Sequence, residues 1–293
     1  MTTGEHRKGN SMKLLDNIDG IAVINMDSRP DRFARFMEKT GCYFPEKKIH
    51  RISAVNGREL STYGKLPWFT DATGDRAGFW GGTGGCALSH RKAIEWAREN
   101  KLRHVLVFED DVVAEVHEGI AELLNTALNN LSGAYMLYLG YNKPAPYGKC
   151  CMKSGEVELW KTEGVIAAHA YIVSAELYDE LLNLMPTENN IWEWLSQYRA
   201  IDVLYRDFVP FLKNVSVYVL HPVVCVQDDT YSDIGQTSFA GIDFACRQAP
   251  RCSGFLRSIL KPLLRLKHKC NSVRTHRRAL KGGLPGFRKS HKK

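Results

Sequence analysis

Residues 104–112 constrain the fold of this chain most strongly, because an apolar run there ends in three consecutive carboxylates. Residues 105–108 are all apolar, and Glu109, Asp110 and Asp111 follow them. A continuous apolar run of this length is typical of a strand buried on both faces, as in a parallel sheet. In open α/β sheets, ligands bind beyond the carboxyl ends of the strands. We therefore expect the acidic triplet to lie at the ligand-binding edge of an α/β domain.

Clustered carboxylates suit Mg²⁺ or Mn²⁺ when the ion also holds phosphate oxygens. The triplet at residues 109–111 therefore indicates a metal–diphosphate site. The alternative is an acidic turn before the next helix, since carboxylates stabilise helix N-termini. These residues by themselves leave both interpretations open.

Strand and helix patterns alternate through the first half of the chain. We expect strands at 21–26, 49–55, 105–108, 135–139, 165–174, 215–220 and 223–227, and helices at 31–39, 85–100, 118–131, 175–184 and 200–208. A long glycine-rich loop is expected at 58–82 and a hairpin at 153–162. Such alternation predicts an α/β fold with a mainly parallel central sheet flanked by helices.

The glycine-rich residues 82–87 fit the dinucleotide-binding pattern G-x-G-x-x-A. That pattern needs a strand directly before it, whereas a long loop is expected here, so we do not predict a Rossmann site. Glycines at a helix N-terminus would still suit a phosphate group. Ser89 and His90 follow on the same helix and point in different directions, so they predict structural hydrogen bonds rather than a nucleophile–base pair.

Charge divides the chain into an acidic body and a basic tail. Residues 244–293 hold 15 Lys or Arg and no Asp or Glu, although the whole chain carries only +8. The remaining 25 basic and 32 acidic residues give the body a net charge of about −7. We expect a disordered N-terminus at 1–18, one folded domain at 19–243 and a basic amphipathic or disordered tail at 244–293.

Within the tail, basic residues repeat every four positions beside an apolar stripe, at Arg257, Lys261, Arg265 and Lys269. This pattern predicts an amphipathic segment at 251–293 that docks on an anionic membrane surface. The alternative is that the apolar stripe packs against the body. Nucleic-acid binding is not favoured, because few aromatic residues interrupt the basic run.

The first 20 residues contain no apolar signal segment, and no stretch approaches the roughly 20 apolar residues of a membrane span. The eight cysteines include no C-x-x-C pair, so neither a zinc motif nor a small disulfide scaffold is indicated. We therefore expect a cytoplasmic protein, peripheral on the cytoplasmic face of the inner membrane if the tail docks there.

Four blocks occur in order at residues 24–32 (INMDSRPDR), 51–57 (RISAVNG), 85–90 (GCALSH) and 107–111 (VFEDD). They resemble the INLDRRPDR, RI-AVDG, GCFLSH and LVFEDD motifs of glycosyltransferase family 25. That family includes bacterial lipooligosaccharide galactosyltransferases and collagen hydroxylysine galactosyltransferases. Further similar blocks follow at 170–174, 201–202 and 227–234. An ordered set of motifs is more specific than any one of them.

The resemblance implies a GT-A-like fold with a single nucleotide-sugar-binding domain, a UDP-sugar donor, Mn²⁺ (or Mg²⁺), and inversion at the anomeric carbon. It implies that Asp111, together with Asp110, binds the metal. The residues expected to contact the donor are Asn25, Arg29, Arg32, Ser89, His90, Glu109, Asp110, Gln227, Ser232 and Asp233.

Asp202 interrupts an apolar helix start and is our hypothesis for the general base that activates the acceptor hydroxyl. Its alternative role is that of a solvated acid at a helix N-terminus. The predicted function is transfer of a hexose, galactose from UDP-galactose, to a lipooligosaccharide or other lipid-linked glycan. The competing functions are an inactive sugar- or nucleotide-binding relative and a nucleic-acid-binding protein that uses the basic tail.

Overall fold

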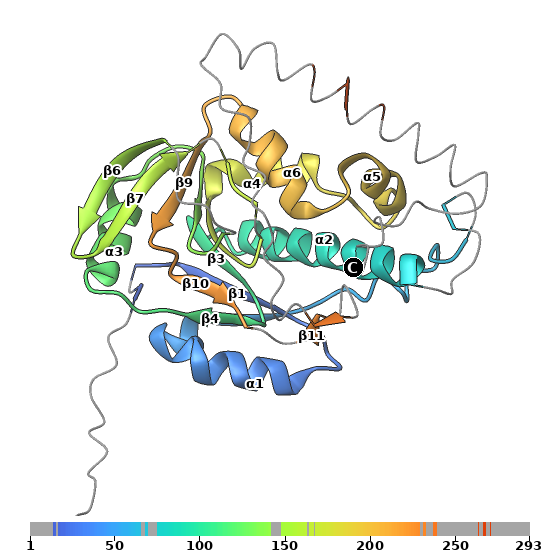
Figure 1. The fold of residues 1–293 in the computed structure, drawn as a ribbon, viewed down its shortest axis with the longest axis horizontal. Coiled ribbons are helices and arrows are strands. Elements are labelled where there is room, and N and C mark those ends of the chain that lie inside the picture. Colours follow the sequence, from blue (N-terminus) through green and yellow to red (C-terminus); the bar gives the residue numbers. More distant parts are fainter. Residues whose placement is uncertain are drawn as a thin grey trace, which may run out of the picture.

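A computed structural model describes residues 14–15, 17–65, 68–69, 75–141, 148–162, 164–166, 168–228, 231–232 and 237–238, with a few positions between 263 and 270. Its centre is an eight-stranded sheet in the order β2-β1-β3-β8-β5-β9-β7-β6 (Figure 1). The strands of this sheet are β1 Gly20–Asn25, β2 Ile49–Ser53, β3 His104–Glu109, β5 Tyr135–Tyr138, β6 Gly148–Ser154, β7 Val157–Thr162, β8 Ala170–Ser174 and β9 Ser216–His221.

The α-helices are α1 Pro30–Lys39, α2 Asp75–Glu99, α3 Ile120–Asn130, α4 Tyr178–Leu184, α5 Ile191–Tyr198 and α6 Ile201–Phe208. Short 3-10 helices occupy Gly41–Tyr43, Glu46–Lys48, Ala175–Leu177 and Val209–Phe211. Two small antiparallel sheets pair β4 Val112–Ala114 with β10 Cys225–Gln227, and β11 Tyr231–Ser232 with β12 Thr237–Ser238. The expected α/β class and the hairpin around 153–162 are confirmed.

The central sheet is mixed, and the prediction of a mainly parallel sheet is wrong. Strand β1 pairs in parallel with β2 and β3, and β5 pairs in parallel with β9. Strand β8 lies between β3 and β5 and is antiparallel to both, and the β6–β7 hairpin adds antiparallel pairs at one edge. An apolar run such as that of β8 has the same pattern in either direction, so its orientation could not be predicted from the sequence.

Side chains of the central strands alternate between two cores, one on each face of the sheet. In β1, Ile21 and Val23 pack with α1 and α3, whereas Ala22 and Ile24 pack with α2, α4, α5 and α6. Figure 1 shows α1 and α3 on one side of the sheet and the other four helices on the opposite side. Burial on both faces explains why β1 and β3 are continuous apolar runs in the sequence.

Helix α2 begins at Asp75, ten residues earlier than predicted, so the glycine-rich stretch is helical rather than a loop or a helix N-terminus. The glycines allow α2 to touch the loop after β2 with backbone atoms. A Cβ atom on Gly85 would lie 2.2 Å from the Val55 carbonyl oxygen, and one on Gly57 would lie 2.0 Å from the Gly81 carbonyl oxygen. Close helix packing, not phosphate binding, therefore accounts for this glycine motif.

The N-terminal boundary predicted at residue 19 is too late. Leu14, Leu15 and Ile18 are buried in the core beside α1 and α3. The folded domain therefore includes residue 14. At the other end, the predicted tail at 244–293 lies outside the described residues except for isolated positions, and its docking on a membrane stays a prediction. Among the helices that the structure describes, none is long and apolar enough to cross a membrane.

Replacing Gly85 with alanine should destabilise the fold, because the new Cβ would overlap the carbonyl oxygen of Val55. We expect the free energy of unfolding, measured by urea denaturation, to fall by about 1–3 kcal/mol. Gly84→Ala is the matched control, since its Cβ would meet only side chains of α5 residues, at 3.0 Å or more. Equal stability of the two variants would contradict the proposed backbone contact.

Candidate active site

The acidic triplet lies where β3 ends, and a small pocket opens beside it. The pocket has a volume of about 80 Å³. Basic residues from the start to the end of α1 line it together with acidic residues that lie mostly after β3 and after β10. Its lining comprises Arg29, Asp31, Arg32, Arg35, Phe36, Lys39, Asp110, Asp111, Val112, Val113 and Asp228. The structure therefore brings two predicted residue sets together in this pocket: the start of α1 and the turn after β3.

Asn25, at the end of β1, positions the Asp110 carboxylate. Its Nδ2 donates to Asp110 Oδ2 at 2.6 Å and to the Arg29 carbonyl oxygen at 2.8 Å. Its Oδ1 accepts from Arg51 Nε at 2.7 Å, and only 1% of the residue is exposed. Both ends of the Asn25 amide group thus hydrogen-bond within the protein. This supports a role in positioning Asp110 rather than direct contact with the sugar donor.

Arg32 pairs with two of the three carboxylates of the triplet. Its Nη2 lies 2.7 Å from Asp110 Oδ1 and 3.2 Å from Asp111 Oδ2. Burial nevertheless raises the pKa of Asp110, against the lowering effect of Arg32 and of the hydrogen bond from Asn25. The two aspartates and Arg32 therefore form a compact and largely buried ionic group.

Asp111 is the most strongly perturbed carboxylate of the triplet. Burial, followed by the charge of Glu109, raises the pKa of Asp111 from 3.8 to about 7. Its Oδ1 is buried and has no hydrogen-bond partner among the residues that the structure describes. A buried carboxylate oxygen without a partner is costly. A divalent cation bound there would satisfy it, so the oxygen-donor set of Asp110 and Asp111 fits Mn²⁺ or Mg²⁺.

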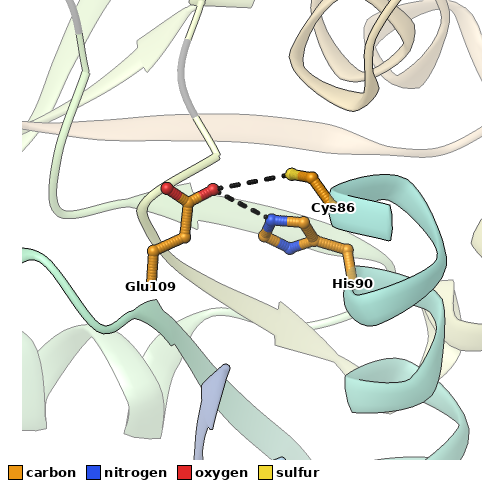
Figure 2. A group of neighbouring side chains, drawn as sticks. All are labelled: Cys86, His90 and Glu109. Carbon is orange, nitrogen blue, oxygen red and sulfur yellow. Dashed lines mark hydrogen bonds and ion pairs between the residues drawn. The ribbon is translucent and has the colours of Figure 1, made fainter. Parts of the chain in front are cut away.

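Glu109 faces the opposite side of β3, toward α2 (Figure 2). Its Oε1 lies 3.2 Å from His90 Nε2 and 3.9 Å from Cys86 Sγ. Burial opposes ionisation, but the hydrogen bond and charge of His90 lower the pKa of Glu109. Gln227 Nε2 donates to Glu109 Oε2 at 3.4 Å. The predicted residues His90, Glu109 and Gln227 are therefore brought together.

Ser89 makes the structural hydrogen bonds expected from its sequence context, and its contact with a donor stays a prediction. Its hydroxyl donates to the Gly85 carbonyl at 2.6 Å and accepts from the Val55 amide at 2.8 Å. The side chain is buried and links α2 to the loop after β2. His90 is also fully buried, and its Nδ1 lies 2.9 Å from the Tyr171 hydroxyl.

Asp202 lies in the first turn of α6, on the same side of the sheet as Glu109 and Cys86. Burial raises the pKa of Asp202, and the charge of Glu109 contributes in the same direction. Its Oδ1 accepts a hydrogen bond from the Val203 amide at 2.7 Å. A hydrogen bond from a first-turn amide is also what an acid at a helix N-terminus makes, so both expected roles of Asp202 stay predictions.

Asp228, the residue after β10, also lines the site. The Asp228 amide donates to the Asp111 carbonyl at 2.8 Å, and the Asp228 carboxylate pairs with Arg35 and Lys39. Arg35 and Lys39 were not among the predicted residues, although their helical spacing from Arg32 was a usable signal. Ser232 lies in β11 without a described side chain, and Asp233 lies outside the described residues; both stay predictions.

The sequence profile of glycosyltransferase family 25 (LPS biosynthesis protein) matches residues 18–189, which is more than half of the chain. The chain belongs to this family. Membership in glycosyltransferase family 25 makes it a transferase of lipopolysaccharide biosynthesis and implies a nucleotide-sugar donor. The match contains the acidic triplet but ends before Asp202 and Gln227, whose roles therefore rest on the geometry above.

No curated protein sequence matches this chain. Among solved structures, it is similar to a mannose-1-phosphate geranyltransferase from Thermus thermophilus, with 11% sequence identity over 74% of this chain and 76% of that one. The TM-score is 0.36, and a similarity at this level carries no argument about fold or substrate.

Replacing Asp111 with asparagine should change how the stability of the metal-free protein depends on pH. Folded Asp111 retains its proton up to about pH 7, whereas the carboxyl ordinarily loses it near 3.8. Its ionisation therefore opposes folding, and wild-type stability should lose this contribution as the pH rises from about 4 to about 7. Asp111→Asn should lose less stability over the same interval.

Urea denaturation across that pH interval, in EDTA and at constant ionic strength, measures the difference. Asp179→Asn is the control, because Asp179 is an exposed carboxylate of α4, far from the triplet in sequence. The control should follow the wild-type pH dependence. A single pH dependence shared by all three proteins would contradict the raised pKa of Asp111.

Proposed function

We propose that this chain is an inverting, metal-dependent glycosyltransferase with a GT-A-like nucleotide-sugar site. It transfers a hexose, galactose from UDP-galactose, to a sugar hydroxyl of a lipooligosaccharide or other lipid-linked glycan. The observation that carries the proposal is the buried Asp111 carboxylate, whose Oδ1 has no partner among the described residues, beside Asp110 at the end of β3. Family membership supplies the reaction class.

In this proposal, Asp111 and Asp110 hold Mn²⁺ or Mg²⁺. The ion supplies charge neutralisation for the departing diphosphate. The basic side chains of the pocket, Arg29, Arg32, Arg35 and Lys39, support the same assignment, because a diphosphate carries negative charge that these side chains can pair with. Asn25 keeps Asp110 oriented toward the pocket.

Asp202 is proposed as the general base that accepts the proton of the acceptor hydroxyl. A base is most effective when its pKa lies near the working pH, and burial raises the pKa of Asp202 in that direction. The acceptor hydroxyl would then be deprotonated as it attacks the anomeric carbon on the side opposite the diphosphate, which gives inversion.

Asp111→Asn should abolish transfer while leaving the fold intact, because it removes one carboxylate charge and keeps the side-chain shape. Turnover is measured as UDP release from UDP-galactose with Mn²⁺ and the acceptor glycan. A bound metal contributes several kcal/mol to the transition state, so we expect a loss of at least about 10³-fold. Wild-type enzyme in EDTA should lose activity likewise.

Circular dichroism verifies the fold of Asp111→Asn, and Asp179→Asn should turn over at the wild-type rate. Wild-type turnover by Asp111→Asn would disprove the metal assignment. No UDP release by the wild-type enzyme with any nucleotide sugar would instead indicate an inactive, sugar-binding relative.

Asp202→Ala should lower kcat by about 10²–10⁴-fold, the contribution typical of a positioned general base. Its effect on donor binding should be small, because Asp202 is assigned to the acceptor rather than to the diphosphate. Steady-state kinetics with varied donor and acceptor separate the two effects. A near-normal kcat for Asp202→Ala would rule out this residue as the base.

A further inference from the structure

Cys86, His90 and Glu109 form a compact cluster that the proposed reaction does not use as a unit. Cys86 and His90 are four residues apart on α2 and therefore project from one face of the helix. Figure 2 shows both side chains directed at the Glu109 carboxylate, which comes from the end of β3. One potential ligand atom from each residue lies within 4.8 Å of the other two.

We propose that Cys86, His90 and Glu109 bind Zn²⁺ or another thiophilic divalent cation, at a site separate from the Asp110–Asp111 carboxylates. Sulfur and imidazole ligands select zinc over the harder Mg²⁺ and Mn²⁺. The two sites share no ligand. The inference also does not depend on the proposed transfer reaction.

Two of the three separations between ligand atoms are close to those of a tetrahedral zinc site. Zn–S and Zn–N or Zn–O bonds of about 2.3 and about 2.0–2.1 Å place neighbouring ligand atoms about 3.3–3.6 Å apart. His90 Nε2 and Glu109 Oε1 are already 3.2 Å apart, and Cys86 Sγ lies 3.9 Å from the same oxygen. Cys86 Sγ and His90 Nε2 lie within 4.8 Å of each other, so the sulfur would move toward the imidazole by at most about 1 Å to complete a tetrahedral site.

His90 is held by its second ring nitrogen, as metal-binding histidines usually are. Its Nδ1 lies 2.9 Å from the Tyr171 hydroxyl, which in turn lies 3.1 Å from the Tyr205 hydroxyl. When Nδ1–H donates to Tyr171, Nε2 keeps a lone pair directed at Glu109 and Cys86. In the metal-free protein Nε2–H donates to Glu109, and on ion binding the proton would reside on Nδ1, where the buried Tyr171 hydroxyl accepts it.

The charges also balance. Ion binding releases the Cys86 thiol proton to solvent, so that one thiolate and one carboxylate neutralise the double positive charge. Without an ion, this thiol faces an acidic environment: burial and the charges of Glu109, Asp202 and Asp111 raise the pKa of Cys86. The same negative surroundings attract a cation.

Cobalt titration of the metal-free, full-length protein tests the inference, because Co²⁺ replaces Zn²⁺ and reports its ligands by absorption. We expect one equivalent to give a thiolate-to-cobalt charge-transfer band and the intense visible bands of tetrahedral cobalt. Excess Zn²⁺ should remove both bands, whereas Mn²⁺ should not. Cys86→Ala should lose the charge-transfer band and at least about 100-fold in affinity, since even outer ligands contribute about 10–100-fold.

Cys150→Ala is the matched control, because Cys150 is an exposed thiol of β6 outside this cluster, and it should titrate like the wild type. A second readout uses the wild-type protein alone: Zn²⁺ should slow alkylation of Cys86, but not of Cys150, as followed by mass spectrometry. The inference is overturned if Cys86→Ala keeps the band, if the wild type shows none, or if Zn²⁺ leaves Cys86 alkylation unchanged. In those cases the cluster is a hydrogen-bonded packing contact.

Discussion

The ion pair of Arg32 with Asp110 and Asp111 is the interaction on which the organisation of this site depends. Three consecutive carboxylates at the end of a buried strand would repel one another and resist desolvation. The guanidinium offsets two of these charges at distances of 2.7 and 3.2 Å. Even so, the pKa of Asp111 remains well above the ordinary value, because burial and Glu109 outweigh the arginine. The negative charge at the site is therefore not fully balanced by Arg32, and a further cation would bind favourably there.

The rest of the fold holds these charges in place from different directions. Strand β1 contributes Asn25 beneath Asp110, and α1 contributes Arg32. Helix α2 supplies His90, which contacts Glu109 on the other face of the sheet. The glycines of α2 let its backbone pack closely against the loop after β2, and this contact sets the distance between the helix and that loop. Glu109 is the last residue of β3, whereas Asp110 and Asp111 lie in the turn that follows. The carboxylates therefore meet two environments: Arg32 for Asp110 and Asp111, and the imidazole of His90 for Glu109.

Much of this arrangement was predictable, and the failures have physical causes. The apolar runs of β1 and β3 and the acidic edge followed from strand periodicity and chain order. The antiparallel direction of β8 did not, because strand pairing is decided by distant partners. The early start of α2 could not be predicted, because glycines favour loops unless tertiary packing requires the close backbone contact that they make here. The hydrogen bonds of the Asn25 amide could likewise not be predicted, because its partners Arg51 and Asp110 are distant in the sequence and meet only in the folded protein.

Calorimetric titration of UDP into wild-type protein and Asp111→Asn, with Mn²⁺ and with EDTA, tests the central claim most directly, because it measures the coupling between metal and diphosphate without requiring the acceptor. We expect Mn²⁺ to tighten UDP binding to the wild type by at least about tenfold, or about 1.4 kcal/mol. Asp111→Asn should bind UDP equally in both conditions. UDP affinity of the wild type that is the same in Mn²⁺ and in EDTA would contradict a metal–diphosphate site at the end of β3.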